Sequence, residues 1–461
     1  MTPTTSESRQ ILLTISWISR QNMPRQKKTK VVIMTRKSVF TNLPSELQSL
    51  LMTDWLEWTE VGRYDSAMCN RTDRKEWLNL LSNRCVFNFI SPGHWGYPPF
   101  FRWCLLRSIR ARDVFIGMCP LFSEETAAEW FQHTGPFLTT LTFHQIKDFV
   151  KDCLVRYCSR LQVLFIERCI LDETIWEILR NNSTLQELHL IQCRELSSPF
   201  PNNITLPFLQ KLELAGDFFN SVNTTAMLEL LPSLRSLKFN QTYITAANEA
   251  LSTVSLPNLV HMHIDCSYHS MDDLIAQKFV TVMKSLTTGL RCLVLPAYHT
   301  FSSIELLSIT QYHGCSLRCL SIQNNINWND RFTDINFVEQ LNQMPLLHTL
   351  QLTYQSLSTL PSLITNLSIT HLYLHYSQSL NSGSIKDAVS AHCPMLNTLS
   401  IFWSPWFFQT DKTMSEISPF LESRPRIQKL CVNDNPTELR KDLPHINVVK
   451  YTPIDIFTTN Y

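Results

Sequence analysis

Hydrophobic side chains recur at regular spacing through most of the chain, in the pattern L-x-x-L-x-L. Three successive copies start at Leu161, Leu185 and Leu209, each 24 residues after the one before. Looser copies start at Leu234, Leu259, Leu290, Leu317, Leu347, Ile369, Leu396 and Ile427. Apolar residues at alternate positions predict a short strand in each copy, and a period of about 20–50 residues predicts stacked repeats.

Helical segments separate the predicted strands, for example at residues 172–180, 271–286 and 384–392. One strand and one helix in each unit of 22 to 31 residues predict parallel strands, because parallel neighbours need a crossover connection. The predicted fold class is α/β, a solenoid with a curved parallel sheet on its inside and helices on its outside. We expect it to cover residues 137–461, including a carboxyl-terminal cap.

A second row of positions supports the repeats. Eight residues after each first leucine-type position, the side chain is small or polar in ten of eleven copies. The row is Cys169, Cys193, Asp217, Thr242, Ser267, Tyr298, Asn325, Gln355, Ser377, Ser404 and Asn435. We expect the chain to turn inward there, where a side-chain donor or acceptor satisfies backbone groups that strand and helix leave unpaired.

The segment 1–37 has the composition of a tail. It carries eight Lys and Arg residues against the single Glu7 and predicts a disordered basic segment. The run Pro24–Lys30 also fits a nuclear import signal, and the acid-poor stretch fits a transit peptide. Met34 is an alternative start.

Residues 38–82 predict a compact unit of three helices. Pro44 suits a first helical turn, where its missing N–H is not needed, and apolar residues follow at helical spacing. Residues 83–136 predict a linker and an amino-terminal cap. In this cap, we expect Phe101–Leu106 and Val114–Ile116 to form an irregular first repeat.

Composition narrows the function classes. The net charge of +1 gives no footprint for nucleic acid, and only nine glycines occur, without a phosphate-binding motif. The 14 cysteines are scattered and include no CxxC pair, which predicts buried thiols rather than a zinc site.

No apolar run reaches about 18 residues, so no membrane span is expected. No catalytic constellation is visible. We therefore expect a protein that is not an enzyme and has no cofactor.

The repeats resemble a known family. The string Cys158-x-x-Leu161-x-x-Leu164-x-Ile166-x-x-Cys169 resembles the cysteine-containing subclass of leucine-rich repeats. Cys315 and Cys393 precede later copies in a similar way. The resemblance covers about two-thirds of the chain and implies a fold rather than a ligand.

The helical unit resembles an F-box. The matching residues are Leu43-Pro44-x-Glu46-Leu47, Trp55-Leu56, Val61, Arg63, Ser66-Ala67-Met68-Cys69 and Arg71. The resemblance implies docking on a Skp1-like adaptor and, through it, on a cullin ubiquitin ligase, with the repeats holding the substrate. Two features differ from the family. Thr72 stands where a tryptophan is usual, and residues 53–58 are more aromatic.

For adaptor docking, we expect one apolar helical face. It consists of Leu43, Pro44, Leu47, Leu51, Leu56 and Val61. The alternative is that this face packs on the first repeats as a cap.

For substrate binding, we expect the residues between the ladder leucines to face the inside of the curve, because side chains alternate along a strand. The candidates are Phe165, His189, Glu213, Lys238, His263, Gln351 and Tyr373, in a longer row that includes Val294, Ser321, Ser400 and Cys431. Their mixed charge predicts a polypeptide ligand. Trp403 and Trp406 belong to an aromatic cluster that predicts either a binding hot spot or burial under the outer helices. The pairs His261/His263 and His371/His375 are four repeats apart, which favours solvent-facing histidines over a shared metal ion.

These patterns predict a substrate-recognition subunit of a Skp1–cullin–F-box ubiquitin ligase. We expect a monomer within that complex, in the cytoplasm or nucleus, that binds a protein target and neither nucleic acid nor membrane. The alternative is a leucine-rich-repeat scaffold with a degenerate helical unit and no ligase link.

Overall fold

The computed structural model describes residues 44, 47–48, 58–67, 71–83, 86–90, 97–116, 123–195, 201, 204–216, 221–240, 244–265, 273–286, 289–295, 303–322, 335–354, 368–376, 395–403, 427–432 and 447–450. The chain divides into two units, Met1–Gln48 and Ser49–Tyr461. In the first unit, Leu47 and Gln48 are helical. The predicted tail 1–37 lies outside the described residues.

Two helices open the second unit. Helix α3 spans Trp58–Ala67 and α4 spans Arg71–Asn83, close to the second and third helices that the sequence predicts. Val61, Trp77 and Leu81 are buried, and Trp77 packs against the Tyr64 ring with the centroids 4.8 Å apart. Apolar side chains at helical spacing therefore form a small core between the two helices.

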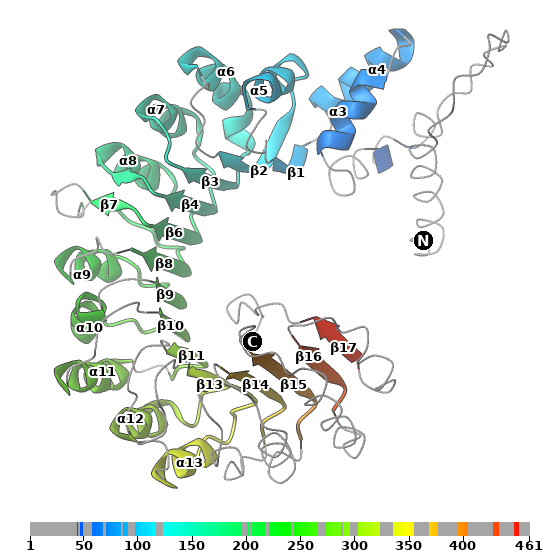
Figure 1. Ribbon diagram of the computed structural model, residues 1–461. Helices are drawn as coiled ribbons and strands as arrows, with labels where there is room; N and C mark the ends of the chain where they lie inside the picture. The colour runs from blue at the N-terminus through cyan, green and yellow to red at the C-terminus, as the bar shows by residue number, and fades with distance from the viewer. Residues whose placement is uncertain are drawn as a thin grey trace. The chain divides into compact units, whose positions relative to one another are not determined.

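One parallel sheet of 15 strands forms most of the second unit (Figure 1). Each strand pairs with the next repeat in the same register. The strands are β1 Val86–Ile90, β2 Arg110–Ile116, β3 Thr140–His144, β4 Val163–Glu167, β6 Glu187–Ile191, β8 Lys211–Ala215, β9 Ser236–Asn240, β10 His261–Asp265, β11 Cys292–Leu295, β12 Cys319–Ile322, β13 Thr349–Tyr354, β14 His371–Tyr376, β15 Thr398–Trp403, β16 Lys429–Val432 and β17 Asn447–Lys450. A second sheet contains β5 Ile170–Leu171 and β7 Arg194–Glu195.

Helices cover one side of this sheet, the outer side of its curve (Figure 1). They are α5 Tyr97–Leu106, α6 Glu124–Thr134, α7 Asp148–Tyr157, α8 Glu173–Asn181, α9 Ser221–Glu229, α10 Ile244–Thr253, α11 Asp273–Ser285, α12 Ser303–His313 and α13 Ile335–Asn342, with a 3-10 turn at Gly135–Phe137. The predicted helix at 384–392 lies outside the described residues. The arrangement is the leucine-rich-repeat solenoid that the sequence predicts.

The core lies between sheet and helices. Leu161, Leu164 and Ile166 are fully buried, and the corresponding residues of the following copies are buried with them wherever the structure describes their side chains. Large aromatic side chains such as Trp130 and Trp176 fill the helix layer. Each repeat buries its apolar face against its neighbours, as a solenoid requires.

The turns after the strands explain the polar row. Gln145, Arg168 and Gln192 directly follow β3, β4 and β6 with φ near 50°, and Gly216 follows β8 with φ 120°. After this left-handed residue, Cys169 donates its S–H to the Glu167 carbonyl oxygen at 3.4 Å. Cys193 donates to the Ile166 carbonyl oxygen at 3.3 Å. In these two repeats, the small side chain satisfies a backbone acceptor, and the other nine positions of the row lie outside the described residues.

The sheet begins earlier than residue 137. Residues predicted as linker and cap supply β1 and β2, which pair with each other and then with β3. Phe101–Leu106 belongs to α5, and Val114–Ile116 ends β2. The leucine pattern misses these strands because their inward positions are filled by Val, Ala and Phe. None of the helices that the structure describes is long and apolar enough to cross a membrane.

Candidate protein-binding face

The predicted substrate-binding residues lie in one line across the sheet. Cα pairing joins Phe165 to His189, and then each strand's residue to the next. The line, which we call the inner row, is Phe165, His189, Glu213, Lys238, His263, Val294, Ser321, Gln351, Tyr373, Ser400 and Cys431. The alternation of a strand places it opposite the buried ladder leucines, on the side without described helices (Figure 1).

The first residues of the inner row contact one another. The rings of Phe165 and His189 stack with their centroids 3.8 Å apart and their planes within 11°. His189 Nδ1 lies 2.8 Å from Glu213 Oε2, and Lys238 Nζ donates to Glu213 Oε1 at 2.9 Å. An aromatic ring, an imidazole, a carboxylate and an ammonium group thus follow each other on four adjacent strands.

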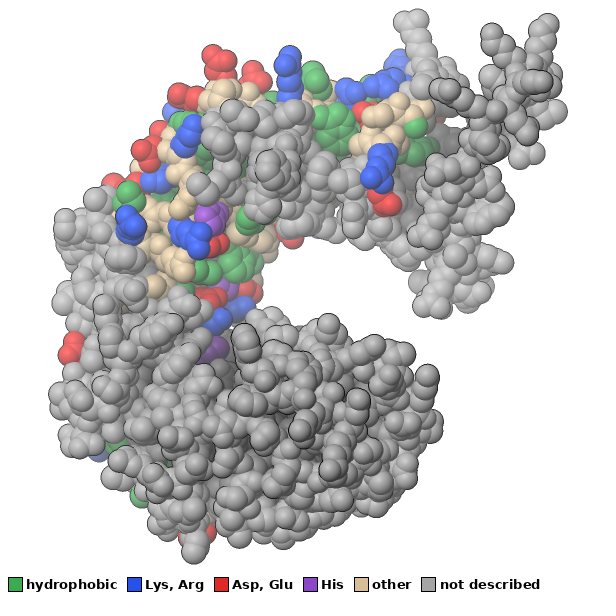
Figure 2. All heavy atoms as spheres, in the orientation of Figure 1, with side chains coloured by type: hydrophobic (Ala, Val, Ile, Leu, Met, Phe, Trp, Pro, Cys, Tyr) green, Lys and Arg blue, Asp and Glu red, His purple; other side chains and the backbone are tan. Residues whose placement is uncertain are grey.

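A parallel line of charges lies two residues earlier on the same strands. Glu187 Oε2 is 3.5 Å from His189 Nε2 and 3.3 Å from Lys211 Nζ. Glu187 is half-exposed, and Lys211 is also partly open to solvent. Figure 2 shows acidic, basic and histidine side chains next to one another in this part of the molecule.

The ion pairs among Glu187, His189, Lys211, Glu213 and Lys238 shift the pKa values of the two carboxyl groups. Burial by itself would raise the pKa of Glu213, but its bonds to His189 and Lys238 outweigh burial and hold that pKa at about 2. The bond to His189 lowers the pKa of Glu187, against the opposing effect of burial and with help from Lys211. Burial and the Lys238 charge lower the pKa of His263 to about 3, although Glu213 acts in the opposite direction. At neutral pH, the face therefore presents fixed carboxylates and ammonium groups beside a neutral imidazole at His263.

Farther along, the inner row becomes uncharged. Val294, Ser321 and Ser400 are at most 2% exposed, Tyr373 is 9% exposed, and Gln351 is half-buried. Strands β11–β15 contain no Asp, Glu, Lys or Arg, whereas each of β4, β6, β8, β9 and β10 contains at least one. This contrast in strand composition is a sequence signal that the leucine pattern alone does not reveal.

The aromatic cluster is only partly described. Trp403 ends β15, where its Cα pairs with Tyr376 of β14. The side chain of Trp403 and the whole of Trp406 lie outside what the structure describes. The choice between hot spot and core thus stays a prediction for both tryptophans.

The predicted adaptor residues fall in both units. Pro44 is exposed and Leu47 is 42% exposed. Val61, on α3, is fully buried, so it packs inside the chain and offers no surface to a partner in this state. Leu43, Leu51 and Leu56 lie outside the described residues.

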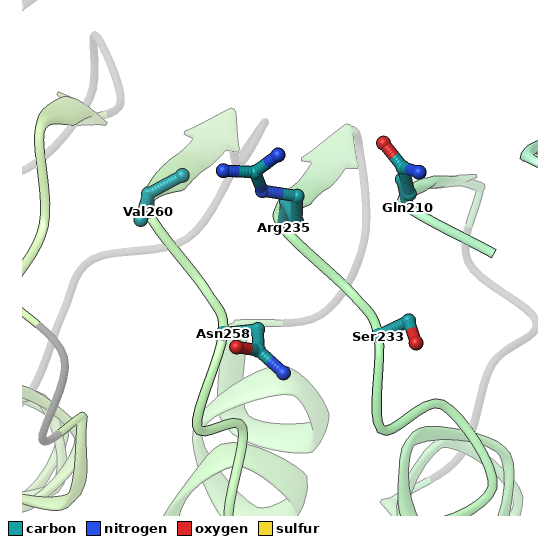
Figure 3. A pocket seen from close by; sticks show the side chains of 5 residues that line it. All are labelled: Gln210, Ser233, Arg235, Asn258 and Val260. Carbon is teal, nitrogen blue, oxygen red and sulfur yellow. The ribbon is translucent and has the colours of Figure 1, made fainter. Parts of the chain in front are cut away.

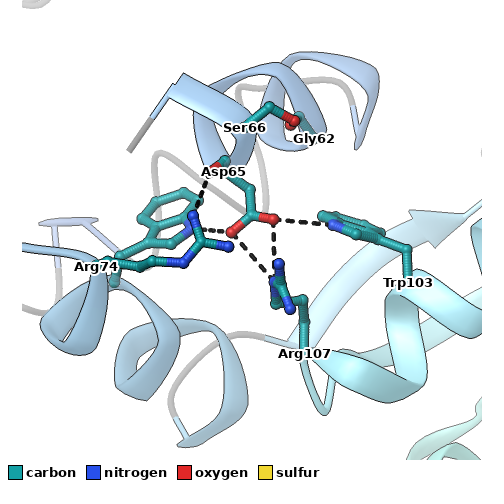
Figure 4. Close-up of polar contacts among 7 residues, drawn as sticks. Gly62, Asp65, Ser66, Arg74, Trp103 and Arg107 are labelled. Atoms are coloured by element: carbon teal, nitrogen blue, oxygen red, sulfur yellow. Dashed lines mark hydrogen bonds and ion pairs between the residues drawn. The ribbon is translucent and has the colours of Figure 1, made fainter. Parts of the chain in front are cut away.

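A buried carboxylate joins α3 to α4 and α5, a contact that the sequence analysis missed (Figure 4). Asp65 is 2% exposed and accepts hydrogen bonds from Trp77 Nε1 and Trp103 Nε1, each at 3.0 Å. Arg107 Nε donates to the same carboxylate at 3.0 and 3.2 Å, and Arg74 donates to the Asp65 carbonyl oxygen. Three donors, Trp77, Trp103 and Arg107, compensate the burial of the carboxylate charge. No local pattern predicts this, because Asp65 and Arg107 are 42 residues apart.

The histidine pairs show no metal-binding geometry. Three strands, β11 to β13, lie between β10 with His261 and β14 with His371. Within the described part of the chain, no three His, Cys, Asp or Glu side chains cluster as metal ligands. Burial lowers the pKa of His261 and of His371, with nearby cations adding to the effect.

Comparisons with known proteins give structural likenesses only. No protein-family model and no curated protein matches the sequence. Among solved structures, the yeast Rad7–Elc1 complex aligns over 89% of this chain and 97% of that chain, with a TM-score of 0.44 and 13% identity. The leucine-rich repeat-containing protein LegL7 from Legionella pneumophila aligns over 72% and 88%, with a TM-score of 0.34 and 13% identity. An internalin from Listeria monocytogenes aligns over 70% and 82%, with a TM-score of 0.33 and 12% identity. The repeat fold of this chain rests on its own register and buried ladder.

Proposed function

We propose that this chain is the substrate-recognition subunit of a Skp1–cullin–F-box ubiquitin ligase. Its amino-terminal helical unit docks on a Skp1-like adaptor, and its inner row holds a protein target. No chemistry is required of this chain, because holding the target near the ubiquitin-charged enzyme raises the effective concentration of its lysines.

The observation that carries target binding is the charged part of the inner row, where Phe165 and Lys238 are partly exposed beside the buried His189 and Glu213. Phe165, His189 and Glu213 lie on adjacent strands, already fixed by mutual contacts. A surface whose side chains are held in place before binding loses less entropy when a partner docks. Its alternating acidic, basic and aromatic groups suit a folded or extended polypeptide with complementary groups.

The exposed apolar residues of the first unit support adaptor docking. Pro44 and Leu47 stand in the F-box-like string and keep contact with solvent in the chain alone. Apolar side chains that stay exposed in a monomer are frequent at interfaces. The Asp65 contacts with Trp103 and Arg107 tie α3 to α5, so the helices after the docking string are firmly joined to the first repeat.

The test is co-purification of the full chain with a Skp1-like adaptor and a cullin. Leu43→Ala with Pro44→Ala should abolish recovery of both, whereas Lys75→Ala with Glu76→Ala, at exposed positions of α4, should leave it unchanged. Unchanged recovery with the first pair would exclude adaptor docking through this string. It would favour the alternative of a repeat scaffold without a ligase link, for which the departure at Thr72 is the specific argument.

A further inference from the structure

A row of arginines lies at the edge of the sheet where the strands begin. Gln210, Arg235, Val260, Arg291 and Arg318 are the residues directly before β8, β9, β10, β11 and β12. Backbone N–H groups link them in order, from Arg235 to the Gln210 carbonyl oxygen at 2.9 Å and onward to Arg318. We call Arg235, Arg291 and Arg318 the arginine edge. Because the main chain is fixed by these bonds, the Cα atoms of the three arginines have a fixed spacing.

A pocket opens beside Arg235 (Figure 3). It has a volume of about 390 Å³ and is lined by Gln210, Ser233, Arg235, Asn258 and Val260. In the figure, Gln210, Arg235 and Val260 form one tier at the strand starts, and Ser233 and Asn258 form a second tier nearer the helices. Its lining therefore combines one cation with amide and hydroxyl groups that bond to peptides.

The positive charge of the edge has no acidic partner among the residues that the structure describes. Among the described residues, none of the three arginines forms an ion pair, and the neighbouring Glu187 and Glu213 are committed to Lys211, His189 and Lys238. After burial, the charges of Arg291 and Arg235 are what lower the pKa of His261. The net charge of the chain is only +1, so this is a local concentration of charge.

The carboxyl ends of two helices weaken the positive potential of the arginine edge. Helices α9 and α10 end at Glu229 and Thr253, shortly before Ser233 and Asn258 in the chain. The carboxyl end of a helix carries a partial negative charge of about half a unit and repels anions. A single arginine would only offset this effect. Three full charges within four adjacent strands exceed it.

We propose that the arginine edge and its pocket bind an acidic, extended segment of a protein partner. Guanidinium groups form paired hydrogen bonds with carboxylates, and the amide and hydroxyl groups of the pocket can bond to the peptide backbone. The edge runs across three strand spacings of about 4.8 Å, and an extended peptide advances about 3.3 Å per residue. The ligand is therefore a stretch of about five residues with carboxylates near both ends.

One further side chain extends the surface. Phe208, two residues before Gln210, is 58% exposed. An apolar residue of the ligand, next to its acidic stretch, could pack against the Phe208 ring. The inference rests on the proposed protein-binding role but does not require the link to a ligase.

The test measures binding of a fluorescent peptide to the full chain by anisotropy. The probe has about five Asp and Glu residues next to a leucine, and the reference probe replaces the acids with Asn and Gln. Arg235→Glu with Arg291→Glu should weaken binding of the acidic peptide by about tenfold, because two attractive pairs become repulsive. Arg235→Gln with Arg291→Gln should give a smaller loss. As a matched control, Arg156→Glu with Arg194→Glu reverses two exposed charges elsewhere and should leave binding unchanged.

Three results would overturn the inference. They are equal affinity for both probes, an unchanged affinity in the Arg235→Glu/Arg291→Glu variant, and tighter binding of a single-stranded oligonucleotide than of the acidic peptide at physiological salt. Circular dichroism melting of each variant separates lost binding from lost folding, and the Gln variant retains the test if the Glu variant unfolds. Adaptor co-purification of the same variants is expected to stay intact. Failure of the unsubstituted chain to recover an adaptor, with intact binding of the acidic peptide, would count against the ligase role alone.

Discussion

Two stretches of one sheet share their backbone and differ in the face opposite the helices. Strands β4, β6, β8, β9 and β10, the charged stretch, carry the contacts from Phe165 through His189 and Glu213 to Lys238. Strands β11–β15, the uncharged stretch, place buried Val294, Ser321 and Ser400 in the same row. A buried charge needs a partner to be tolerated, and the 9% exposed Glu213 has two, His189 and Lys238. The repeat thus fixes where a side chain lies but not what surrounds it.

A second difference lies in how the two stretches close their helices. After α8, Asn182 accepts the Leu161 N–H at 2.9 Å and donates to the Cys158 carbonyl oxygen at 2.9 Å. At the end of α12, His313 accepts the Leu290 N–H at 3.2 Å and bonds to the Met283 carbonyl oxygen at 2.9 Å. Both residues accept the N–H of the first ladder leucine one repeat back and bond to a carbonyl oxygen before it, but only histidine titrates near neutral pH.

The largest expected effect comes from placing a cation in both stretches. Cys292 is the first residue of β11 and is 1% exposed. Val163 is the first residue of β4 and is half-buried. Cys292→Lys should lower the free energy of unfolding by about 3–5 kcal/mol, because the ammonium group would be buried and its paired neighbours His261 and Cys319 carry no carboxylate. Val163→Lys should cost less than about 1 kcal/mol, because its neighbour Glu187 is negative. Urea denaturation measures both, and equal costs would contradict the comparison.

An exchange of Glu and Gln within the inner row should have the next largest effect. Glu213→Gln leaves Lys238 and His189 without their carboxylate, and we expect a loss of about 1–3 kcal/mol in the free energy of unfolding. Gln351→Glu puts a carboxylate between Ser321 and Tyr373, and we expect a loss of about 1–2 kcal/mol. If both changes left the free energy of unfolding in urea unchanged, the charged and uncharged stretches of the inner row would tolerate a carboxylate equally well.

The pH dependence of stability tests the difference between Asn182 and His313 at the two helix ends. Burial lowers the pKa of His313, outweighing its bond to the Met283 carbonyl, so the folded protein keeps this imidazole neutral. The unfolded chain takes up the proton near pH 6.5, and stability is therefore lost as pH falls below that value, by at most about 1.4 kcal/mol per pH unit for one proton.

His313→Asn should reduce this slope between pH 7 and pH 5 while keeping most of the stability at pH 7, because an Asn side chain can accept the ladder-leucine N–H, as Asn182 does in its own repeat. Glu213 does not interfere in this range, since its pKa of about 2 lies below the unfolded value and its contribution is lost only under more acidic conditions. Guanidinium denaturation across the pH range measures the slope. An unaltered slope in His313→Asn would assign the pH dependence to other histidines.

The smallest effect is expected at the open margin of the charged stretch. Glu187 is 37% exposed, against 11% for Glu213, and its pair with Lys211 is 3.3 Å long. Glu187→Gln should lower the free energy of unfolding by less than about 1 kcal/mol, and added salt should remove most of the difference from the unsubstituted protein. A loss as large as that of Glu213→Gln would show that exposure does not set the strength of these pairs.

The leucine pattern determined the strand positions, the parallel direction and the buried side of each strand from Leu161 to Ile427. Those features depend on spacing along the chain, which the sequence states directly. The first two strands escaped this pattern, because Val114 and its neighbours replace the leucines. The positions of the inner row were predictable because side chains alternate between the two faces of a strand, while the role of these residues in binding stays a prediction.

Only the tertiary structure decided which side chains of that row are buried, and how its charges are matched. His189 meets Glu213 across a 24-residue separation, and Asp65 meets Arg107 across 42. Such contacts depend on which segments become neighbours after folding. Burial then sets the strength of each charge interaction, because a low dielectric strengthens both the attraction and the cost of leaving a charge alone. Sequence spacing contains neither quantity.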